Sequence, residues 1–170
     1  TVDIMRGDTR TPDFLARNPN AKVPLLELDD GRCLAESNAI LLFLAEGSRL
    51  VPTEPFSRAR MLQWLFFEQY SHEPYIAVAR FIALYLGLPE ERRADYLSKQ
   101  AGGYNALDVM ETQLQSSPYL VADEPSLADI ALYAYTHVAA DGGFELTGYP
   151  AITAWLRRIE SLPGYQPMKA

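Results

Sequence analysis

The hydrophobic pattern of the chain changes once along its length, at residues 47–57, and the two sides of this change predict different folds. Residues 1–46 hold short apolar runs separated by turn residues, which is typical of small strands and helices. The segment 47–57, GSRLVPTEPFS, combines Gly, Pro and hydroxyl residues as linkers do. After it, apolar residues recur at helical spacing, as Trp155 and Ile159 do. We therefore expect an α+β fold, with a mixed N-terminal domain over 1–46 and an all-α helical bundle over 58–170.

The composition excludes several classes of protein. Asp and Glu outnumber Lys and Arg by 22 to 15, so the chain lacks the basic excess of a nucleic-acid-binding protein. One Cys and two His are too few for a dedicated Cys/His zinc site, although this leaves carboxylate sites open. No apolar run reaches the roughly 18 residues of a membrane span, so we expect no membrane association. The lone Cys33 cannot form a disulfide within the chain, which favours a reducing, cytoplasmic location.

Turn and cap signals divide the first 46 residues into elements. Thr11 and Pro12 form an N-cap followed by a proline in the first helical turn, and Asp30-Gly31 is a hairpin signal. We expect a strand at 1–5, a helix at 12–17, hairpin strands at 23–29 and 32–35, and a helix that begins at residue 37. Three strands with only two helices leave one face of the sheet bare. We therefore expect roughly one strand–helix unit, about 30 residues, to precede Thr1.

Two short motifs lie at the ends of the predicted hairpin. Val23-Pro24 places a proline at the start of a strand, where the preceding peptide bond is either cis or part of an ordinary trans turn. Ser37 is either a plain helix cap or part of an anion site, because a helix N-terminus attracts carboxylates. Glu36 beside it could bind an ammonium group. Together, Glu36 and Ser37 would suit a zwitterionic amino-acid head group.

Three motifs, taken in order, resemble the soluble glutathione transferases, bacterial-like or theta-like. NPNAKVPLLELDDGRCLAESNAILLFLAE, residues 18–46, is similar to the second half of their thioredoxin-like domain, with N-P-x-x-K/Q-V-P, a hairpin and then E/Q-S. The run 125–130, PSLADI, resembles the capping box of their helical domain, in which Ser126 and Asp129 cap each other's backbone. The segment from Trp155 to Tyr165 resembles the end of their last helix. The resemblance spans essentially the whole chain.

The resemblance implies a glutathione site in the N-terminal domain. Pro24 corresponds to the cis-proline that turns the Val23 backbone toward the cysteinyl part of glutathione. Ser37 would bind the γ-glutamyl carboxylate, Glu36 the ammonium group and Lys22 the glycyl carboxylate. The complete set of implied binding residues, including a less constant position at 9–10, is Thr9, Arg10, Lys22, Val23, Pro24, Glu36 and Ser37.

The resemblance also implies an activity, the conjugation of the glutathione thiolate to hydrophobic electrophiles, by a homodimer used in detoxification. Glutathione is then a co-substrate, and no separate cofactor or metal is expected. The thiol-activating Ser, Tyr or Cys of the family falls before Thr1, so we expect no catalytic residue in this chain and interpret Cys33 as structural. The alternatives are a non-catalytic binding or assembly module, and a glutathione-dependent peroxidase or isomerase.

Several residues of the helical part are further candidates. His72 with Glu73 is interpreted as a surface feature at a helix kink caused by Pro74, the alternative being a pair at a cleft. His137 is interpreted as a packing histidine. Aromatic and basic residues on the first long helix would line an electrophile pocket or belong to the core; these are Tyr70, Tyr75, Arg80, Phe81 and Tyr85. The apolar residues expected to serve a homodimer contact are Phe56, Trp64 and Phe67.

Overall fold

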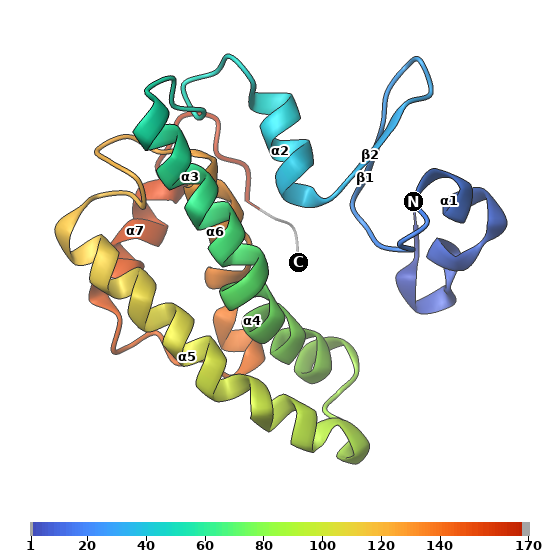
Figure 1. The fold of residues 1–170 in the computed structure, drawn as a ribbon. Helices are drawn as coiled ribbons and strands as arrows, with labels where there is room; N and C mark the ends of the chain where they lie inside the picture. Colours follow the sequence, from blue (N-terminus) through green and yellow to red (C-terminus); the bar gives the residue numbers. More distant parts are fainter. Residues whose placement is uncertain (1, 168–170) are drawn as a thin grey trace. The chain divides into compact units, whose positions relative to one another are not determined.

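The computed structural model describes residues 2–167, and the chain divides into two compact units, Thr1–Ser48 and Arg49–Ala170. Figure 1 shows short helices and a hairpin in the first unit and packed helices in the second. Within the described range, no helix is long and apolar enough to cross a membrane.

The first unit contains a two-stranded antiparallel sheet and short helices. Its helical elements are η1 (Ile4–Arg6), η2 (Asp8–Arg10), α1 (Pro12–Arg17) and α2 (Ser37–Ala45). Strand β1 (Leu25–Glu27) pairs with β2 (Cys33–Ala35), with Leu26 opposite Leu34. The turn forms at the expected Asp30-Gly31, where Gly31 has a φ of 83° that favours glycine. The predicted hairpin is therefore confirmed, with strands shorter than expected.

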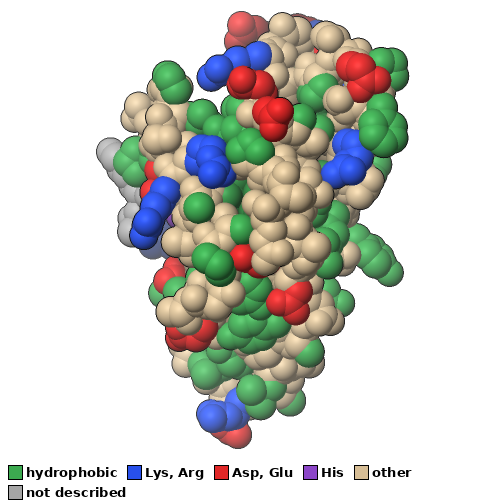
Figure 2. All heavy atoms as spheres, turned by 90° about the vertical axis from the view of Figure 1, so that its left-hand side faces the viewer, with side chains coloured by type: hydrophobic (Ala, Val, Ile, Leu, Met, Phe, Trp, Pro, Cys, Tyr) green, Lys and Arg blue, Asp and Glu red, His purple; other side chains and the backbone are tan. Residues whose placement is uncertain are grey.

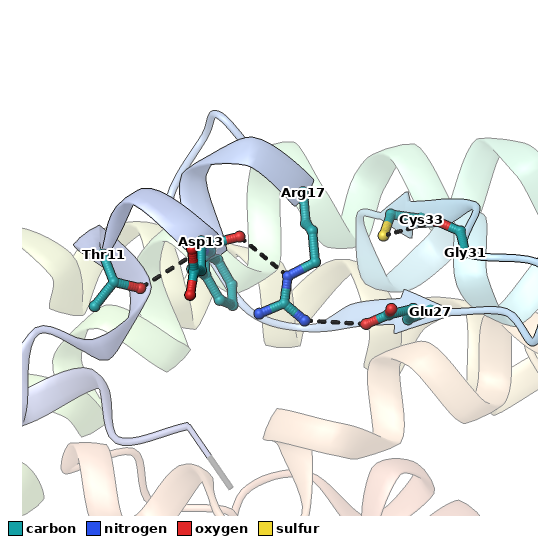
Figure 3. Close-up of polar contacts among 7 residues, drawn as sticks. Thr11, Asp13, Arg17, Glu27, Gly31 and Cys33 are labelled. Carbon is teal, nitrogen blue, oxygen red and sulfur yellow. Dashed lines mark hydrogen bonds and ion pairs between the residues drawn. The ribbon is translucent and has the colours of Figure 1, made fainter.

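Helix α1 forms as its local chemistry predicts. The Thr11 hydroxyl accepts a hydrogen bond from the Phe14 N–H at 3.4 Å, and Pro12 opens the helix. At its other end, Arg17 Nη1 lies 3.0 Å from Glu27 Oε2, which ties α1 to β1 (Figure 3). Phe14, which is 4% exposed, is the buried residue of this helix.

The expected strand at residues 1–5 is wrong for the part of it that the structure describes. Thr1 lies outside the described residues, and Ile4–Arg6 forms the 3-10 helix η1. The Asp3 carboxylate accepts hydrogen bonds from Met5 N at 2.9 Å and Arg6 N at 3.3 Å. This capping stabilises a helical turn locally, whereas a strand depends on a pairing partner. The sheet of the described residues consequently has two strands and not three.

The second unit is helical throughout, as expected. Its elements are α3 (Pro55–Phe67), η3 (Glu68–His72), α4 (Glu73–Arg80), η4 (Phe81–Tyr85), η5 (Glu90–Arg92), α5 (Arg93–Ser116), α6 (Leu127–Thr136), η6 (Ala139–Gly142) and α7 (Pro150–Glu160). Helix α3 begins within the expected linker. The turn before Pro74 is a π-helix, η3, which widens the helical path where the sequence predicted a kink. The largest fully buried side chains of this unit include Trp155, Phe144, Met61 and Ile76.

Helix α5 passes very close to its neighbours at two consecutive glycines. A Cβ atom added at Gly102 would overlap the ring of Tyr75 on α4. One added at Gly103 would overlap the ring of Phe144, which is completely buried. Because neither glycine has a side chain, the two aromatic rings fit against the helix at these positions, and any larger residue there would exclude the rings.

A carboxylate from α5 caps the start of α7. The two carboxylate oxygens of Glu111 accept hydrogen bonds from Ala151 N at 3.0 Å and Ile152 N at 2.9 Å, and Glu111 is only 7% exposed. Pro150, the first residue of α7, has no N–H to satisfy. Glu111 thus supplies the acceptors that the first turn of α7 needs.

Replacing Glu111 with glutamine is expected to lower the free energy of unfolding by about 1–2 kcal/mol. Glutamine keeps the shape and one acceptor oxygen but loses the charge and the second acceptor. Urea unfolding of the variant and the wild type measures the difference. The exposed Glu145, replaced in the same way, is the control and should change stability by less than about 0.5 kcal/mol. Equal effects at the two positions would contradict the capping role.

Candidate functional site

The first part of the candidate site is the loop before β1. The Val23–Pro24 peptide bond is cis, as expected. The buried Asn18 shapes the approach to this bond, because its Nδ2 donates to the Lys22 carbonyl at 2.8 Å and its Oδ1 accepts the Asn20 N–H at 3.1 Å. Sequence reasoning treated Asn18 only as part of a motif and missed this role. The sequence signal for this role was an Asn that is followed by Pro and lies four residues before Lys22, whose carbonyl its side chain binds.

The second part is the start of α2. Ser37 is the first helical residue, so Glu36 and not Ser37 occupies the N-cap position. Glu36 has φ 70° and ψ 114°, a conformation that costs a non-glycine residue free energy, and its side chain makes no capping hydrogen bond. The first N–H groups of an α-helix have no acceptor within the helix. The N-terminus of α2 is therefore suited to an anion.

The hairpin register brings these two parts to the same end of the sheet. Leu25 pairs with Ala35, so Pro24 and Glu36 each lie one residue beyond this pair. Val23 is 46% exposed, and Lys22 and Glu36 are also exposed, which leaves a cation and an anion accessible near the start of α2. This end of the hairpin can thus offer a helix N-terminus, a carboxylate and an ammonium group to one ligand.

Two of the sequence-predicted residues, Thr9 and Arg10, lie outside the hairpin. Thr9 is buried and Arg10 is exposed, both on η2. None of the contacts recorded for the described residues joins either side chain to the end of the hairpin. Cys33, on β2, is half-buried, and its Sγ lies 3.7 Å from the Gly31 carbonyl oxygen (Figure 3).

In the helical unit, the interpretation of His72 as a surface feature is wrong. His72 is completely buried, and its Nε2 lies 2.9 Å from Thr136 Oγ1 on α6. The Thr136 hydroxyl donates to the Leu132 carbonyl at 2.6 Å, so Nε2 must be the donor to Thr136. Burial lowers the pKa of His72 to about 4. His137, in contrast, packs as expected, with its ring stacked on Tyr133 and Nδ1 donating to the Tyr133 carbonyl.

The five candidate pocket residues do not line the groove of about 470 Å³ found in this unit. Tyr75 packs against Gly102, while Tyr70 is 86% exposed. Arg80 donates from Nε to Asp141 at 3.0 Å and from Nη1 to the Tyr85 hydroxyl at 3.3 Å, and Phe81 stacks on Tyr85. This groove lies between α3 and α5 and is lined by other residues. The pocket interpretation of these five residues therefore stays a prediction.

The capping box of α6 is present, and its carboxylate does more than cap. Asp129 is completely buried and accepts the Ser126 N–H at 2.9 Å and the Ser126 hydroxyl at 3.0 Å. Its other oxygen accepts Leu120 N and Trp155 Nε1, each at 2.9 Å. Burial raises the pKa of Asp129, although these hydrogen bonds act in the opposite direction. Sequence reasoning found the Ser126 contact but missed the other two, which come from distant segments.

The motif at the end of the last helix is also anchored. The hydroxyl groups of Tyr165 and Tyr133 lie 2.6 Å apart, and Tyr133 also donates to Glu160 at 3.2 Å. Across the described residues, no group of three or more His, Cys, Asp and Glu side chains is placed to hold a metal ion. The candidate site is accordingly the end of the hairpin in the first unit.

The glutathione S-transferase family models match both units. The N-terminal domain model covers residues 1–46, and the C-terminal domain model covers residues 63–163. A glutathione S-transferase structure from Pseudomonas fluorescens Pf-5 has 65% sequence identity and a TM-score of 0.96, with 98% of this chain and 83% of that chain covered. A maleylacetoacetate isomerase from Methylobacterium extorquens AM1, solved with malonate and GSH bound, has 30% identity and a TM-score of 0.76, with 95% and 78% covered.

A curated relative is named for another activity. The disulfide-bond oxidoreductase YfcG of Escherichia coli is 31% identical, with 95% of this chain and 78% of the relative covered. The relatives therefore share a fold and differ in the reaction for which they are named. On the matches of both domain models, the chain belongs to the glutathione S-transferase family.

Proposed function

We propose that the chain binds glutathione at the end of the β1–β2 hairpin and belongs to a cytoplasmic, homodimeric glutathione transferase that acts in detoxification. The observation that carries this proposal is the N-terminus of α2, which Glu36 leaves without a side-chain cap and which the register places beside Pro24. A structural neighbour with GSH bound supports the ligand. The substrates would be glutathione and a hydrophobic electrophile.

Each exposed group of the site has a role in this proposal. The Ser37 hydroxyl and the α2 N-terminus bind the γ-glutamyl carboxylate, and the Glu36 carboxylate binds the ammonium group. The Val23 backbone pairs with the cysteinyl unit, as in the addition of one strand residue. Lys22 faces the glycyl carboxylate, with Thr9 and Arg10 as further candidates for that end.

Chemistry would then follow from positioning. The nucleophile is the glutathione thiolate, whose sulfur forms a bond to the electrophilic carbon as the leaving group departs or the double bond accepts the electrons. The ordinary pKa of a thiol is about 8.5, so a thiol-activating group must lower it. We assign that role to no residue of this chain. The residues that bind glutathione hold it in position for the reaction, and this positioning itself lowers the activation free energy.

Ser37→Ala is expected to weaken glutathione binding by roughly 1.5–3 kcal/mol, because a charge-assisted hydrogen bond is lost. Glu36→Ala should lose a comparable amount, and Lys22→Ala less, because an exposed lysine is screened. Calorimetric titration of glutathione into the wild type and each of the three variants gives the ranking. Unchanged affinity after Ser37→Ala would refute the site.

The names of relatives favour a second candidate, a glutathione-dependent isomerase or disulfide reductase on the same site. Assays with a chlorinated aromatic electrophile, a maleyl isomerisation substrate and a mixed glutathione disulfide separate the candidates. Wild-type protein that binds glutathione but turns over none of them would favour the non-catalytic module.

A further inference from the structure

Three oxidisable side chains follow one another from the core of the helical unit toward its surface. Trp155 on α7 is completely buried, Tyr133 on α6 is 7% exposed, and Tyr165 beyond the end of α7 is half-buried. The ring centroids of Trp155 and Tyr133 are 6.3 Å apart, and those of Tyr133 and Tyr165 are 5.9 Å apart, both pairs edge to face. Indole and phenol rings are among the groups of a protein that give up a single electron most readily. The contacts therefore offer an electron a path between the core and the surface.

Hydrogen bonds give each of these groups an acceptor for its proton. Trp155 Nε1 donates to Asp129 at 2.9 Å. The Tyr133 hydroxyl donates to Glu160 Oε1 at 3.2 Å, and since it has a single hydrogen, it accepts the 2.6 Å bond from the Tyr165 hydroxyl. Burial and this bond to Tyr165 raise the pKa of Tyr133, so the phenol keeps its proton until the ring is oxidised. An oxidised phenol is a strong acid, and here its proton has an acceptor in contact.

We propose that a one-electron oxidation of Trp155 is passed through Tyr133 to Tyr165, which is the residue left modified. The oxidant is of the peroxyl-radical class and takes one electron from the indole. Tyr133 reduces Trp155 while its own proton passes to Glu160. Tyr165 then reduces Tyr133 by giving up an electron and the proton of the 2.6 Å bond. In sum, one electron moves from Tyr165 to the indole and one proton to Glu160, which leaves a neutral phenoxyl radical at Tyr165.

Direct attack on exposed tyrosines is the competing route to the same kind of product. Tyr70 is 86% exposed and Tyr85 is 54% exposed. Figure 2, in which tyrosine is coloured with the hydrophobic side chains, shows such side chains at the surface beside charged ones on one face. The test must therefore start the oxidation at a tryptophan. A laser pulse at the red edge of the tryptophan absorption band, where tyrosine does not absorb, ejects an electron from an indole whatever its burial, and a cobalt(III) ammine captures that electron.

The two tryptophans of the chain provide a matched comparison. The ring contact recorded for Trp64 among the described residues is with Phe67, which is far harder to oxidise than a tyrosine. In Trp64→Phe the pulse acts on Trp155, and the indolyl radical should convert to a phenoxyl radical at a first-order rate that is independent of protein concentration. In Trp155→Phe the pulse acts on Trp64, and the phenoxyl signal should be lost. Transient absorption distinguishes the two radicals.

A nitroso spin trap, followed by peptide mass spectrometry, locates the phenoxyl radical, and the adduct is expected on Tyr165. Tyr165→Phe should abolish that adduct. Tyr149→Phe is the control, because the Tyr149 hydroxyl also donates to a carboxylate, that of Asp108 at 2.8 Å, but belongs to no such series of rings. Glu160→Gln, at an exposed position, should slow the conversion because it removes the proton acceptor of Tyr133.

Three results would overturn the proposal. A Trp155 radical that decays without a phenoxyl signal, in a Trp64→Phe variant that circular dichroism shows to be folded, refutes the path. If that variant fails to fold, the wild type compared with Trp155→Phe gives the same contrast. An adduct on Tyr70 in place of Tyr165 refutes the end point. An unchanged rate in Glu160→Gln refutes the proton transfer. Glutathione is absent from all of these measurements, so they are independent of the hairpin site.

Discussion

Asp129→Ala is expected to lower the free energy of unfolding by about 4 kcal/mol, because it removes the acceptor of three buried N–H groups. These belong to Leu120, Ser126 and Trp155, and each lies 2.9 Å from a carboxylate oxygen. A buried donor left without an acceptor costs about 1–3 kcal/mol, and neighbouring losses are not fully additive. Urea unfolding, followed by circular dichroism and tryptophan fluorescence, measures the loss.

Two further variants separate the cap from the rest of this network. Asp129→Asn keeps one acceptor oxygen and should lose about half as much as Asp129→Ala. Ser126→Ala should cost about 1 kcal/mol, and a double-mutant cycle should show coupling between Ser126 and Asp129. If Asp129→Ala lowered the free energy of unfolding no more than Ser126→Ala does, the hydrogen bonds to Leu120 and Trp155 would contribute nothing to stability.

Acidification from pH 7.5 to pH 4 is expected to cost the folded protein about 3 kcal/mol through His72 alone. Burial lowers the pKa of His72 to about 4 in the folded state, against about 6.5 when unfolded. Between these values the unfolded state binds the extra proton, so stability falls as the pH falls. At about 1.36 kcal/mol per pH unit the full difference is worth a little over 3 kcal/mol. About 3 kcal/mol of it is lost by pH 4, where half of the folded rings are protonated, and about 2 kcal/mol is lost by pH 5.

The two histidines of the chain allow this contribution to be isolated. His72→Gln keeps an N–H donor for Thr136 and cannot titrate, so its stability should depend less steeply on pH between 5 and 7.5. His137→Gln, at the stacked and partly exposed position, should retain the wild-type slope. Urea midpoints at several pH values give both slopes. Parallel curves for wild type and His72→Gln would show that His72 is not buried as a neutral ring.

Local chemistry made much of the fold predictable. Thr11-Pro12 starts α1 and Asp30-Gly31 makes the hairpin turn, because a cap or turn depends on residues within four positions of each other. The Ser126–Asp129 box formed for the same reason. The strand expected at residues 1–5 failed because Asp3 caps a turn there, whereas strand pairing depends on a partner distant in sequence.

The candidate site, like the fold, was predictable where it depends on residues close together in the sequence. The hairpin fixes the neighbourhood of Pro24 and Glu36, so their proximity follows from the turn and the register. The start of α2 at Ser37 was predicted, whereas the positive φ of Glu36 at the N-cap position follows from no residue propensity. The burial of His72 depends on the π-helical turn and on Thr136, 64 residues away, and it could not be read from the local pattern.

The consecutive glycines of α5 restrict the rotation of this helix within its unit. Successive residues of a helix point about 100° apart, so Tyr75 and Phe144 press against α5 from two directions at one level. Rotating the helix about its own axis would replace a glycine at one of the rings with a residue that carries a side chain, and that side chain would overlap the ring. The amide protons of this part of α5 should therefore exchange with solvent only when the whole unit opens, while those of the exposed end of the helix exchange through small local fluctuations.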